Sequence, residues 1–563
     1  MIVSESRVPW WKRAVIYQIY PRSFQDSNGD GMGDIPGIIS RLDYLQTLGI
    51  DAIWLSPVFC SPQDDNGYDI SDYEDIDPIF GTMEDMDELI READKHGIRI
   101  IMDLVLNHSS DEHCWFREAK KSRDNPYHDY YIWRDGDALS PPNDMKASFG
   151  GSAWEWVPEL GQYYFHQYSR KQPDLNWENP VLRQEIYAMI NRWTERGISG
   201  YRLDVVDHLG KEPDRCIKVN GPKLHDYLRE MSAACFQRSE LVTVGEAWSA
   251  DPETAKLYSN PDGSELSMVF QFEHMILDQR PVGDKWDIVP QDFLALKKIF
   301  TRWQTELAGE GWNSLFWDNH DLPRCVSHLG NEDRYRVESA KMLAILLHGM
   351  QGTPYIYQGE ELGMTNAGDY TLEDYQDIEI RNMIREKRAS GMPDEEILRR
   401  LRIKGRDNAR TPMQWDAGVN AGFTTGEPWI RVNPNYTDIN AADQVNRDNS
   451  VFCCYRELIR LRKRYSIFIN GVYEPLLEDD KHIFAYRRTD DTGELLVICN
   501  FFDVPVRDVL KEEQQSGKML ISSYEEPSED SSLLRPYEAR MIFRSAVEPG
   551  QTGRKQYNRG EKG

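Results

Sequence analysis

Disulfide chemistry and membrane insertion are both poorly supported by this sequence. Only eight of the 563 residues are cysteine and none form a C-x-x-C pair, which argues against a disulfide framework and favours free thiols. No window of 18 apolar residues occurs, so a membrane span is not expected. The N-terminus lacks an apolar run followed by a small-residue cleavage site. We therefore expect an unexported, cytoplasmic protein.

Positive charge is also scarce. The chain has 66 Lys and Arg against 94 Asp and Glu, a formal net charge of −28. Such a charge repels phosphate backbones and anionic lipid headgroups, which favour basic surfaces. Neither nucleic acid nor a membrane is therefore expected as a partner, and a monomer is the default expectation.

Aromatic residues, by contrast, are abundant, with 16 Trp, 28 Tyr and 19 Phe. Apolar residues make up 40% of the chain, enough for a large core with rings left over for a binding site. The length predicts two or three domains, of which a barrel of about 250 residues or more can be the largest.

Short apolar, β-rich runs alternate with longer helical stretches along most of the chain. Several runs are continuously apolar, as is typical of parallel strands covered on both faces. The candidate strands span residues 15–20, 50–58, 98–106, 200–206, 241–247, 268–272, 315–320 and 353–361. Eight strands separated by helices predict an α/β fold, the (β/α)8 TIM barrel.

Other segments interrupt or follow this alternation. Residues 107–177 are polar and aromatic and too long for a plain loop, which predicts a small inserted domain after the third strand. Residues 1–106 and 178–480 then form the barrel, with a helical extension after the eighth strand at about 363–415. Alternating residues in 481–550 predict a C-terminal antiparallel β-sandwich domain, and the polar tail 551–563 is expected to be disordered.

Polar residues gather where four candidate strands end, the edge at which barrel loops build active sites. They are Asp103 and His108, Arg202 and Asp204, Glu246, and His320 and Asp321. One such residue alone is more often a helix cap or a satisfied core residue, but four strand ends with carboxylates favour a site. Carboxylates without a phosphate loop or serine nucleophile suit glycoside hydrolysis. One attacks or stabilises the anomeric carbon, and another protonates the leaving oxygen.

Longer motifs carry a family resemblance over nearly the whole chain. They include "VIYQIYPRSFQDSNGDGMGDIPGI", "DDNGYDISDY", "LVLNHSSDEH", "GYRLDVVDHLGKEPD", "TVGEAWS", "FWDNHDLPR" and "RDNARTPMQW". The sequence resembles the alpha-amylase family, glycoside hydrolase family 13, and within it the oligo-1,6-glucosidase and dextran glucosidase branch. The resemblance implies a retaining exo-acting alpha-glucosidase that releases glucose from the non-reducing end of α-1,6-linked isomalto-oligosaccharides.

The resemblance also implies a role for each strand-end residue. Asp204 would be the nucleophile, Glu246 the general acid/base and Asp321 the carboxylate that clamps the sugar hydroxyls. The others would support the same glucose or these carboxylates: His108 and His320 by binding hydroxyls, Arg202 by keeping Asp204 ionised, and Asp103 from beneath.

Exo-action needs a closed pocket, for which the resemblance supplies further residues. Asp65 would pair with Arg410, and Tyr68 would stack on the ring. The remaining contacts would be Phe149 and Gln172 from the inserted domain, and Trp248, Lys285 and Glu379 at the next sugar. Val205, after the nucleophile, matches relatives that prefer α-1,6 bonds. The alternative is that Val205 is simply a good strand residue.

Other activities remain open at this point. Transglucosylation and sucrose isomerisation use the same covalent intermediate. Sucrose isomerases carry an arginine-rich loop where this sequence has only Arg324. A trehalose-6-phosphate hydrolase would need a cationic cluster that the sequence does not place. A transporter heavy chain would keep the fold without activity, but such proteins have a membrane span and have lost catalytic carboxylates.

The stretch "DSNGDGMGD" begins like a calcium loop. Its oxygen ligands would be Asp26, Asn28, Asp30, the Met32 carbonyl and Asp34. The twelfth position of an EF-hand requires glutamate but is Gly37 here, so a calcium switch is not expected. The alternatives are a metal-free turn and, as the family resemblance implies, a structural Ca2+ or sometimes Mg2+ ion.

Overall fold

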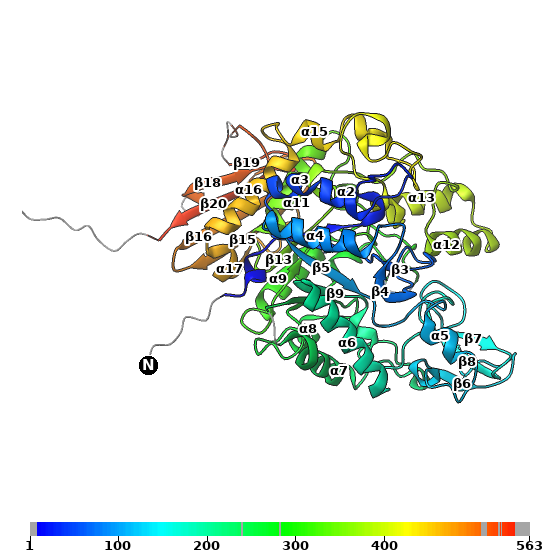
Figure 1. Ribbon diagram of the computed structural model, residues 1–563. Helices are drawn as coiled ribbons and strands as arrows, with labels where there is room; N and C mark the ends of the chain where they lie inside the picture. The colour runs from blue at the N-terminus through cyan, green and yellow to red at the C-terminus, as the bar shows by residue number, and fades with distance from the viewer. Residues whose placement is uncertain are drawn as a thin grey trace, which may run out of the picture.

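The computed structural model describes residues 8–237, 240–280, 283–507, 510, 515–526, 528, 530 and 532–546 (Figure 1). The tail 551–563, expected to be disordered, lies outside these described residues. All eight cysteines are free thiols. In the described part of the chain, no helix combines the length and apolar character needed to cross a bilayer.

Eight parallel strands form the central sheet, and the prediction of a TIM barrel is confirmed. They are β1 (Ile16–Ile19), β2 (Ala52–Leu55), β5 (Arg99–Leu104), β9 (Gly200–Leu203), β10 (Val242–Glu246), β11 (Met268–Phe270), β12 (Ser314–Leu315) and β13 (Thr353–Tyr357). Their order is β11-β10-β9-β5-β2-β1-β13-β12, and a parallel bridge from Val269 to Asn313 joins the two end strands. Alternate side chains fill the interior, among them Ile16, Trp54, Ile101, Val244, Phe270 and Tyr355.

Helices cover the outside of the barrel because each presents an apolar face to the strands. Helix α4 (Met83–Lys95) begins with a capping box between Thr82 and Asp85. Helix α6 (Pro180–Arg196) has Asn179 as its cap and proline at its first position. Helix α11 (Arg336–His348) is buried between the barrel and the C-terminal sheet, where the Tyr486 hydroxyl donates to the Leu346 carbonyl at 2.7 Å.

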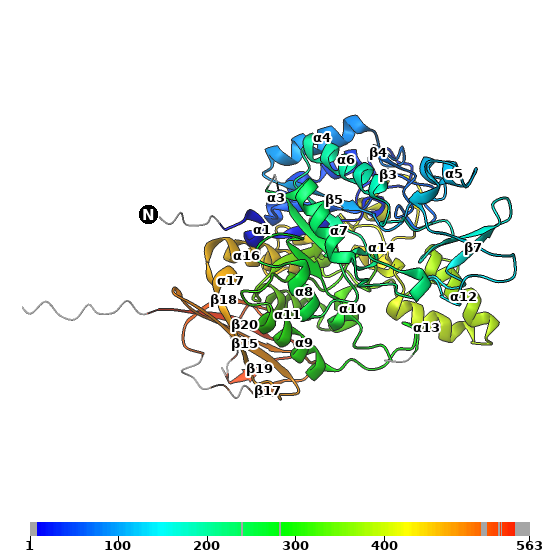
Figure 2. The same cartoon turned by 90° about the horizontal axis from the view of Figure 1, so that it is seen from below.

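The expected inserted segment forms a small sheet of its own. It contains helix α5 (Cys114–Ala119) and the antiparallel strands β6 (Trp133–Asp135), β8 (Gln162–Phe165) and β7 (Trp154–Val157), in that spatial order. After β13 follow α12 (Ile378–Ala389), α13 (Asp394–Lys404) and α14 (Asp407–Arg410). Both views place this extension and the inserted segment at the end of the molecule away from the C-terminal sheet (Figures 1 and 2).

The C-terminal domain is antiparallel, as expected. Its main sheet has the order β14 (Val472–Leu476), β15 (Ile483–Asp490), β16 (Gly493–Asn500), β20 (Ala539–Ser545) and β18 (Lys518–Ser522). A second ladder, β17 (Val506–Arg507) with β19 (Leu533–Leu534), packs against it through Val506 and Leu534. The sheet begins before the expected boundary at 481, because β14 pairs along its length with β15.

Candidate active site

Carboxylates from three neighbouring strands meet at one buried guanidinium, that of Arg202. Its Nη1 donates to Asp103 Oδ1 at 2.9 Å and to Asp204 Oδ1 at 2.7 Å, and its Nη2 lies 2.6 Å from Glu246 Oε2. Strand register explains the meeting, because Asp103 of β5 pairs with Arg202 of β9, and β9 pairs with β10. The strand-end prediction thus placed these four residues together correctly.

This cluster contains more acid than base. Burial raises the pKa of Asp103 to about 6, against the opposing effect of Arg202. Burial likewise raises the pKa of Asp204, which Arg202 also opposes. Three close carboxylates around one cation therefore favour retention of a proton within the cluster. A pair of carboxyl groups that differ in protonation is what glycoside cleavage requires.

Both oxygens of Glu246 are held by neighbouring residues. Trp248 Nε1 donates to Oε1 at 2.9 Å, and the Val205 backbone N–H donates to Oε2 at 3.1 Å. The Trp248 ring stacks on Phe272, with centroids 3.8 Å apart and 9° between the planes. Trp248 is 39% exposed, so its ring is open to a bound molecule beside the acid/base candidate.

Val205 is not a strand residue. Strand β9 ends at Leu203, and Val205 has φ +36° and ψ +50°, the left-handed region. A β-branched residue is strained there, and such strain gathers at functional sites. The alternative that Val205 is explained by strand propensity is therefore wrong.

Asp321 is bound by two arginines and a histidine. Its Oδ1 accepts from Arg410 Nη2 at 2.8 Å and from Arg406 Nη1 at 3.1 Å, and its Oδ2 lies 3.2 Å from His320 Nε2. Burial opposes ionisation, but the charges of Arg406 and Arg410 lower the pKa of Asp321 well below its usual range. Asp321 is therefore ionised at any working pH.

The expected ion pair between Asp65 and Arg410 is wrong, because Asp65 pairs with Arg406. Arg406 Nη2 lies 3.2 Å from Asp65 Oδ1, whereas Arg410 Nη1 donates to Asp377 Oδ2 at 2.8 Å. Arg406 and Arg410 are one helical turn apart around α14 and point the same way, and both reach Asp321. Arg406 and Asp377 are site residues that sequence reasoning missed. For Arg406, the signal was the first arginine of "RDNAR", which precedes Arg410 by four residues.

Tyr68 and the two histidines form the neighbouring wall. The Tyr68 hydroxyl donates to Asp103 Oδ2 at 3.0 Å, and its ring stacks on His320 with 3° between planes and centroids 5.2 Å apart. His108 Nε2 lies 3.0 Å from the Tyr68 carbonyl oxygen. Burial lowers the pKa of His108 to about 4 and that of His320 to about 3. Both rings are therefore neutral near pH 7 and suited to bind hydroxyl groups.

The inserted segment reaches this wall through Gln172 and Phe149. Gln172 Nε2 donates to Asp65 Oδ2 at 3.1 Å. The Arg406 guanidinium lies 5.1 Å from the centroid of the Phe149 ring. Tyr168, which sequence reasoning missed, has its ring 5.4 Å from Phe149 and 5.4 Å from His108. These contacts join the inserted domain to the barrel site.

Lys285 and Glu379, expected beside the next sugar, form an ion pair with each other. Glu379 also lies 3.5 Å from Arg406 Nε. Arg324 behaves differently, because it is fully buried and donates to the backbone carbonyls of Gln358 and Ala409. It therefore faces the protein interior and is unsuited to select a substrate.

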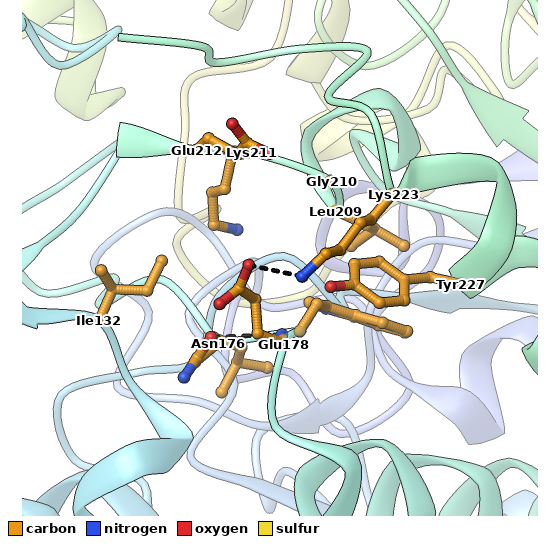
Figure 3. A pocket seen from close by; sticks show the side chains of 11 residues that line it. Ile132, Asn176, Glu178, Leu209, Gly210, Lys211, Glu212, Lys223 and Tyr227 are labelled. Carbon is orange, nitrogen blue, oxygen red and sulfur yellow. Dashed lines mark hydrogen bonds and ion pairs between the residues drawn. The ribbon is translucent and has the colours of Figure 1, made fainter. Parts of the chain in front are cut away.

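A separate small cavity lies where the inserted domain meets the loop after β9 (Figure 3). Its volume of about 10 Å³ suits one water molecule and excludes a sugar. Lys211, beside it, binds Asp174 at 3.0 Å and the Asn107 side chain at 2.5 Å. On its rim Lys223 binds Glu178 at 3.0 Å. This cavity belongs to the domain junction.

The suspected calcium loop, residues 26–34, is closely folded around Asp26. Asp26 Oδ1 accepts from Asn28 N and Gly29 N at 2.9 and 2.7 Å, and its Oδ2 accepts from Gly31 N at 2.8 Å. Gly29 and Gly31 have positive φ angles of 84° and 90°. Together with Asp30 and the Met32 carbonyl, the loop offers the hard oxygen donors that Ca2+ prefers.

Asp34, at the end of this loop, already has local partners. Its Oδ1 accepts from Gly37 N at 2.6 Å and caps helix α2 (Ile35–Ser40), and its Oδ2 accepts from the Ser27 hydroxyl at 2.8 Å. Asp26 is held as fully, because its Oδ2 also accepts from the Thr424 hydroxyl, so these bonds do not separate Asp34 from the other candidate ligands.

An eight-stranded parallel barrel with strand-end carboxylates gathered around an arginine defines a class, the barrel glycoside hydrolases. The alpha amylase catalytic domain matches residues 18–471, and the chain belongs to the alpha-amylase family of glycoside hydrolases.

The relatives of the chain include enzymes of more than one activity. It is 53% identical over 558 residues to an oligo-1,6-glucosidase of Halalkalibacterium halodurans, covering 95% of this chain and 99% of that one. It is 54% identical over 532 residues to a glucan 1,6-alpha-glucosidase of Streptococcus pneumoniae, covering 94% and 98%. The crystal structure of a trehalose-6-phosphate hydrolase from Bacillus licheniformis gives a TM-score of 0.91 at 47% identity, covering 95% and 99%.

Proposed function

We propose that the chain is a retaining, exo-acting alpha-glucosidase that releases glucose from the non-reducing end of α-1,6-linked isomalto-oligosaccharides. The observation that carries the proposal is the Arg202 guanidinium, which bridges Asp204 and Glu246 through its two terminal nitrogens. One bridging group favours the short carboxylate spacing of retaining enzymes, about 5–5.5 Å, over the about 6.5–9.5 Å of inverting ones.

The reaction would proceed in two steps. In the first, an Asp204 carboxylate oxygen bonds to the anomeric carbon while the glycosidic C–O bond breaks, and Glu246 gives its proton to the leaving oxygen. In the second, water gives a proton to Glu246 and bonds to the anomeric carbon, which releases Asp204 and glucose. Asp321, ionised between Arg406 and Arg410, would hold the hydroxyls of the same sugar.

The arrangement around Arg406 supports exo-action on neutral sugars. Arg406 joins Asp65 to Asp321 and covers Phe149, so these residues form a wall behind the glucose site. Lys285, the cation expected at the next sugar, is paired with Glu379. A phosphorylated aglycone would have to compete with that carboxylate, which favours isomaltose over trehalose 6-phosphate.

Glucose release from a substrate panel tests the proposal. Purified protein would be incubated with isomaltose, panose, maltose, sucrose, trehalose and trehalose 6-phosphate, with Asp204→Asn as the matched inactive control. We expect the highest kcat/KM on isomaltose or panose, and α-glucose as the first product seen by NMR. Release of β-glucose would contradict retention, and preference for maltose or sucrose would assign the broader or sucrose-active alternative.

We further propose a structural Ca2+ ion at residues 26–34, held by Asp26, Asn28, Asp30, the Met32 carbonyl and Asp34, with Mg2+ as the alternative ion. The oxygen-only donor set supports this assignment. The ion would stabilise the fold through binding linkage and take no part in bond cleavage. We also propose a cytoplasmic monomer, for which light scattering during size exclusion gives the oligomeric state.

A further inference from the structure

The turn after Asp204 is fastened to the loop after Glu246. Asp207 lies in the 3-10 turn Val206–His208, three residues after Asp204, and Ser249 lies three residues after Glu246. Asp207 Oδ2 accepts from the Ser249 backbone N–H at 3.2 Å and from the Ser249 hydroxyl. Asp207 is fully buried, so bulk water does not compete for these bonds.

The local sequence permits this contact and supports it from outside. Gly245 precedes Glu246 on β10, and a Cβ there would lie 2.6 Å from Val206 Cγ1, so the absent side chain lets the turn pack against the strand. On the other side, Asn220 Nδ2 donates to Ser249 Oγ at 2.9 Å. The Tyr258 hydroxyl in turn donates to Asn220 Oδ1 at 2.8 Å.

The fastened loop carries the residue that fixes the acid/base. Trp248 stands between Glu246 and Ser249, donates to Glu246 Oε1 and stacks on Phe272. The other oxygen of Glu246 receives the N–H of Val205, which belongs to the same turn as Asp207. Both oxygens of Glu246 are therefore held by residues that adjoin the contact between Asp207 and Ser249.

We propose that Asp207 is a positioning residue that keeps the Trp248–Ser249 loop in place, so that Glu246 is aligned with the glycosidic oxygen. Asp207 acts through Ser249 and touches no substrate. The inference rests on the proposed alpha-glucosidase function. Asp207 would support protonation of the leaving group by Glu246, whereas attack by Asp204 would not depend on Asp207.

Leaving groups of different basicity test the assignment. The Asp207→Ala variant would be assayed on isomaltose, whose leaving alkoxide needs a proton, and on α-glucosyl fluoride, whose leaving fluoride does not. We expect kcat/KM, which reports the glucosylation step, to fall about 10- to 100-fold on isomaltose and less than about threefold on the fluoride. Asp207→Asn keeps an acceptor oxygen for Ser249 and should stay within about threefold of wild type on both.

A second signature comes from added azide, which attacks the glucosyl-enzyme without help from a base. Azide should raise kcat of Asp207→Ala on α-glucosyl fluoride and leave that of the wild type unchanged. Equal losses on the two substrates, or no loss on isomaltose, would overturn the assignment. If Asp207→Ala does not fold, Ser249→Ala should show the same selective loss on a smaller scale, and its absence would count against the proposal.

Failure of the α-1,6 proposal would look different. Wild-type protein would then cleave α-glucosyl fluoride but not isomaltose. The comparison for Asp207 would move to whichever unactivated glucoside the wild type cleaves, with the same expected selectivity.

Discussion

Arg406 binds Asp65 across 341 positions of sequence, with 3.2 Å between Nη2 and Oδ1. The bond joins the segment after β13 to the segment after β2, and it lies within a network that also contains Asp321 and Asp377. The members of this ion network therefore come from distant parts of the chain, and we expect them to close the proposed glucose pocket.

Removing only Arg406 should lower kcat/KM more than replacing Arg406 and Asp65 together. Arg406→Ala leaves Asp65 buried without its partner, so we expect kcat/KM on isomaltose to fall about 100-fold or more. The Asp65→Asn/Arg406→Ala double variant should lose much less than the sum of the single losses in a double-mutant cycle. The matched control Arg410→Ala should show no such coupling with Asp65→Asn, and equal coupling for both arginines would contradict the assignment.

Val205 should influence bond preference. Val205 carries a β-branched side chain in the left-handed region beside Asp204, and we expect that side chain to obstruct a 4-linked aglycone. Val205→Ala is therefore expected to raise the ratio of maltose to isomaltose hydrolysis by about tenfold, the range typical of small apolar changes in a pocket. Initial rates on the two disaccharides check this. An unchanged ratio would mean that the valine has no part in specificity.

Acid should weaken the fold through buried histidines, of which His274 is a clear case. Its Nε2–H donates to the Phe316 carbonyl at 3.0 Å, and its Nδ1 accepts from the Gln271 amide at 2.9 Å. Burial lowers the pKa of His274 to about 4. Between about pH 6.5 and 4 the unfolded chain binds a proton that the folded chain refuses, so stability falls as pH falls, by up to about 3 kcal/mol.

His274→Gln lacks this titration and serves as the control. The Tm advantage of the wild type over the variant should shrink as pH falls from 7 to 4. A Tm advantage of the wild type that grows as the pH falls would contradict the expected loss of stability in acid.

Chelation of the proposed ion should lower thermal stability more than it lowers catalytic activity. Removing an ion from residues 26–34 should lower Tm by several degrees, while activity at moderate temperature stays within about twofold. Differential scanning fluorimetry with EDTA, then with added Ca2+ or Mg2+, measures the shift and identifies the ion. Asp30→Ala should abolish the response, and an unaltered Tm on chelation would favour the metal-free turn.

The fold was largely predictable because its signal is repeated. Each of the eight apolar runs predicted as a strand overlaps a strand of the barrel. The seventh strand is shorter than expected, because the sequence predicted residues 315–320 and the structure has only Ser314–Leu315. The residues that follow it bond elsewhere through their side chains: Trp317 Nε1 donates to the Leu343 carbonyl at 2.8 Å, and the Asp318 carboxylate accepts from Cys325 N at 2.8 Å. The bond from Trp317 joins residues 26 positions apart, so the local sequence pattern does not report it.

The site was predictable at strand ends and less so in the loops. Asp103, Arg202, Asp204 and Glu246 follow from strand register, which the period of the sequence reports. The choice between Arg406 and Arg410 as the partner of Asp65 depends on the path of the chain after β13, and both have the same residue type. Val205 departs from its strand propensity because its N–H is drawn to Glu246, a tertiary contact.

The loop at residues 26–34 is hydrogen-bonded to residues 423 and 429, which lie late in the sequence of the catalytic domain. Asp26 N donates to the Phe423 carbonyl at 3.0 Å, and Trp429 N donates to the Gly31 carbonyl at 3.0 Å. Nearby, the Ser23 hydroxyl donates to the carbonyl of Arg410, one of the two arginines that hold Asp321. The back wall of the proposed glucose pocket is thus held by hydrogen bonds between an early loop and a late loop, in addition to the barrel strands. On heating, we expect these two loops to unfold locally, so that activity is lost while the eight strands remain folded.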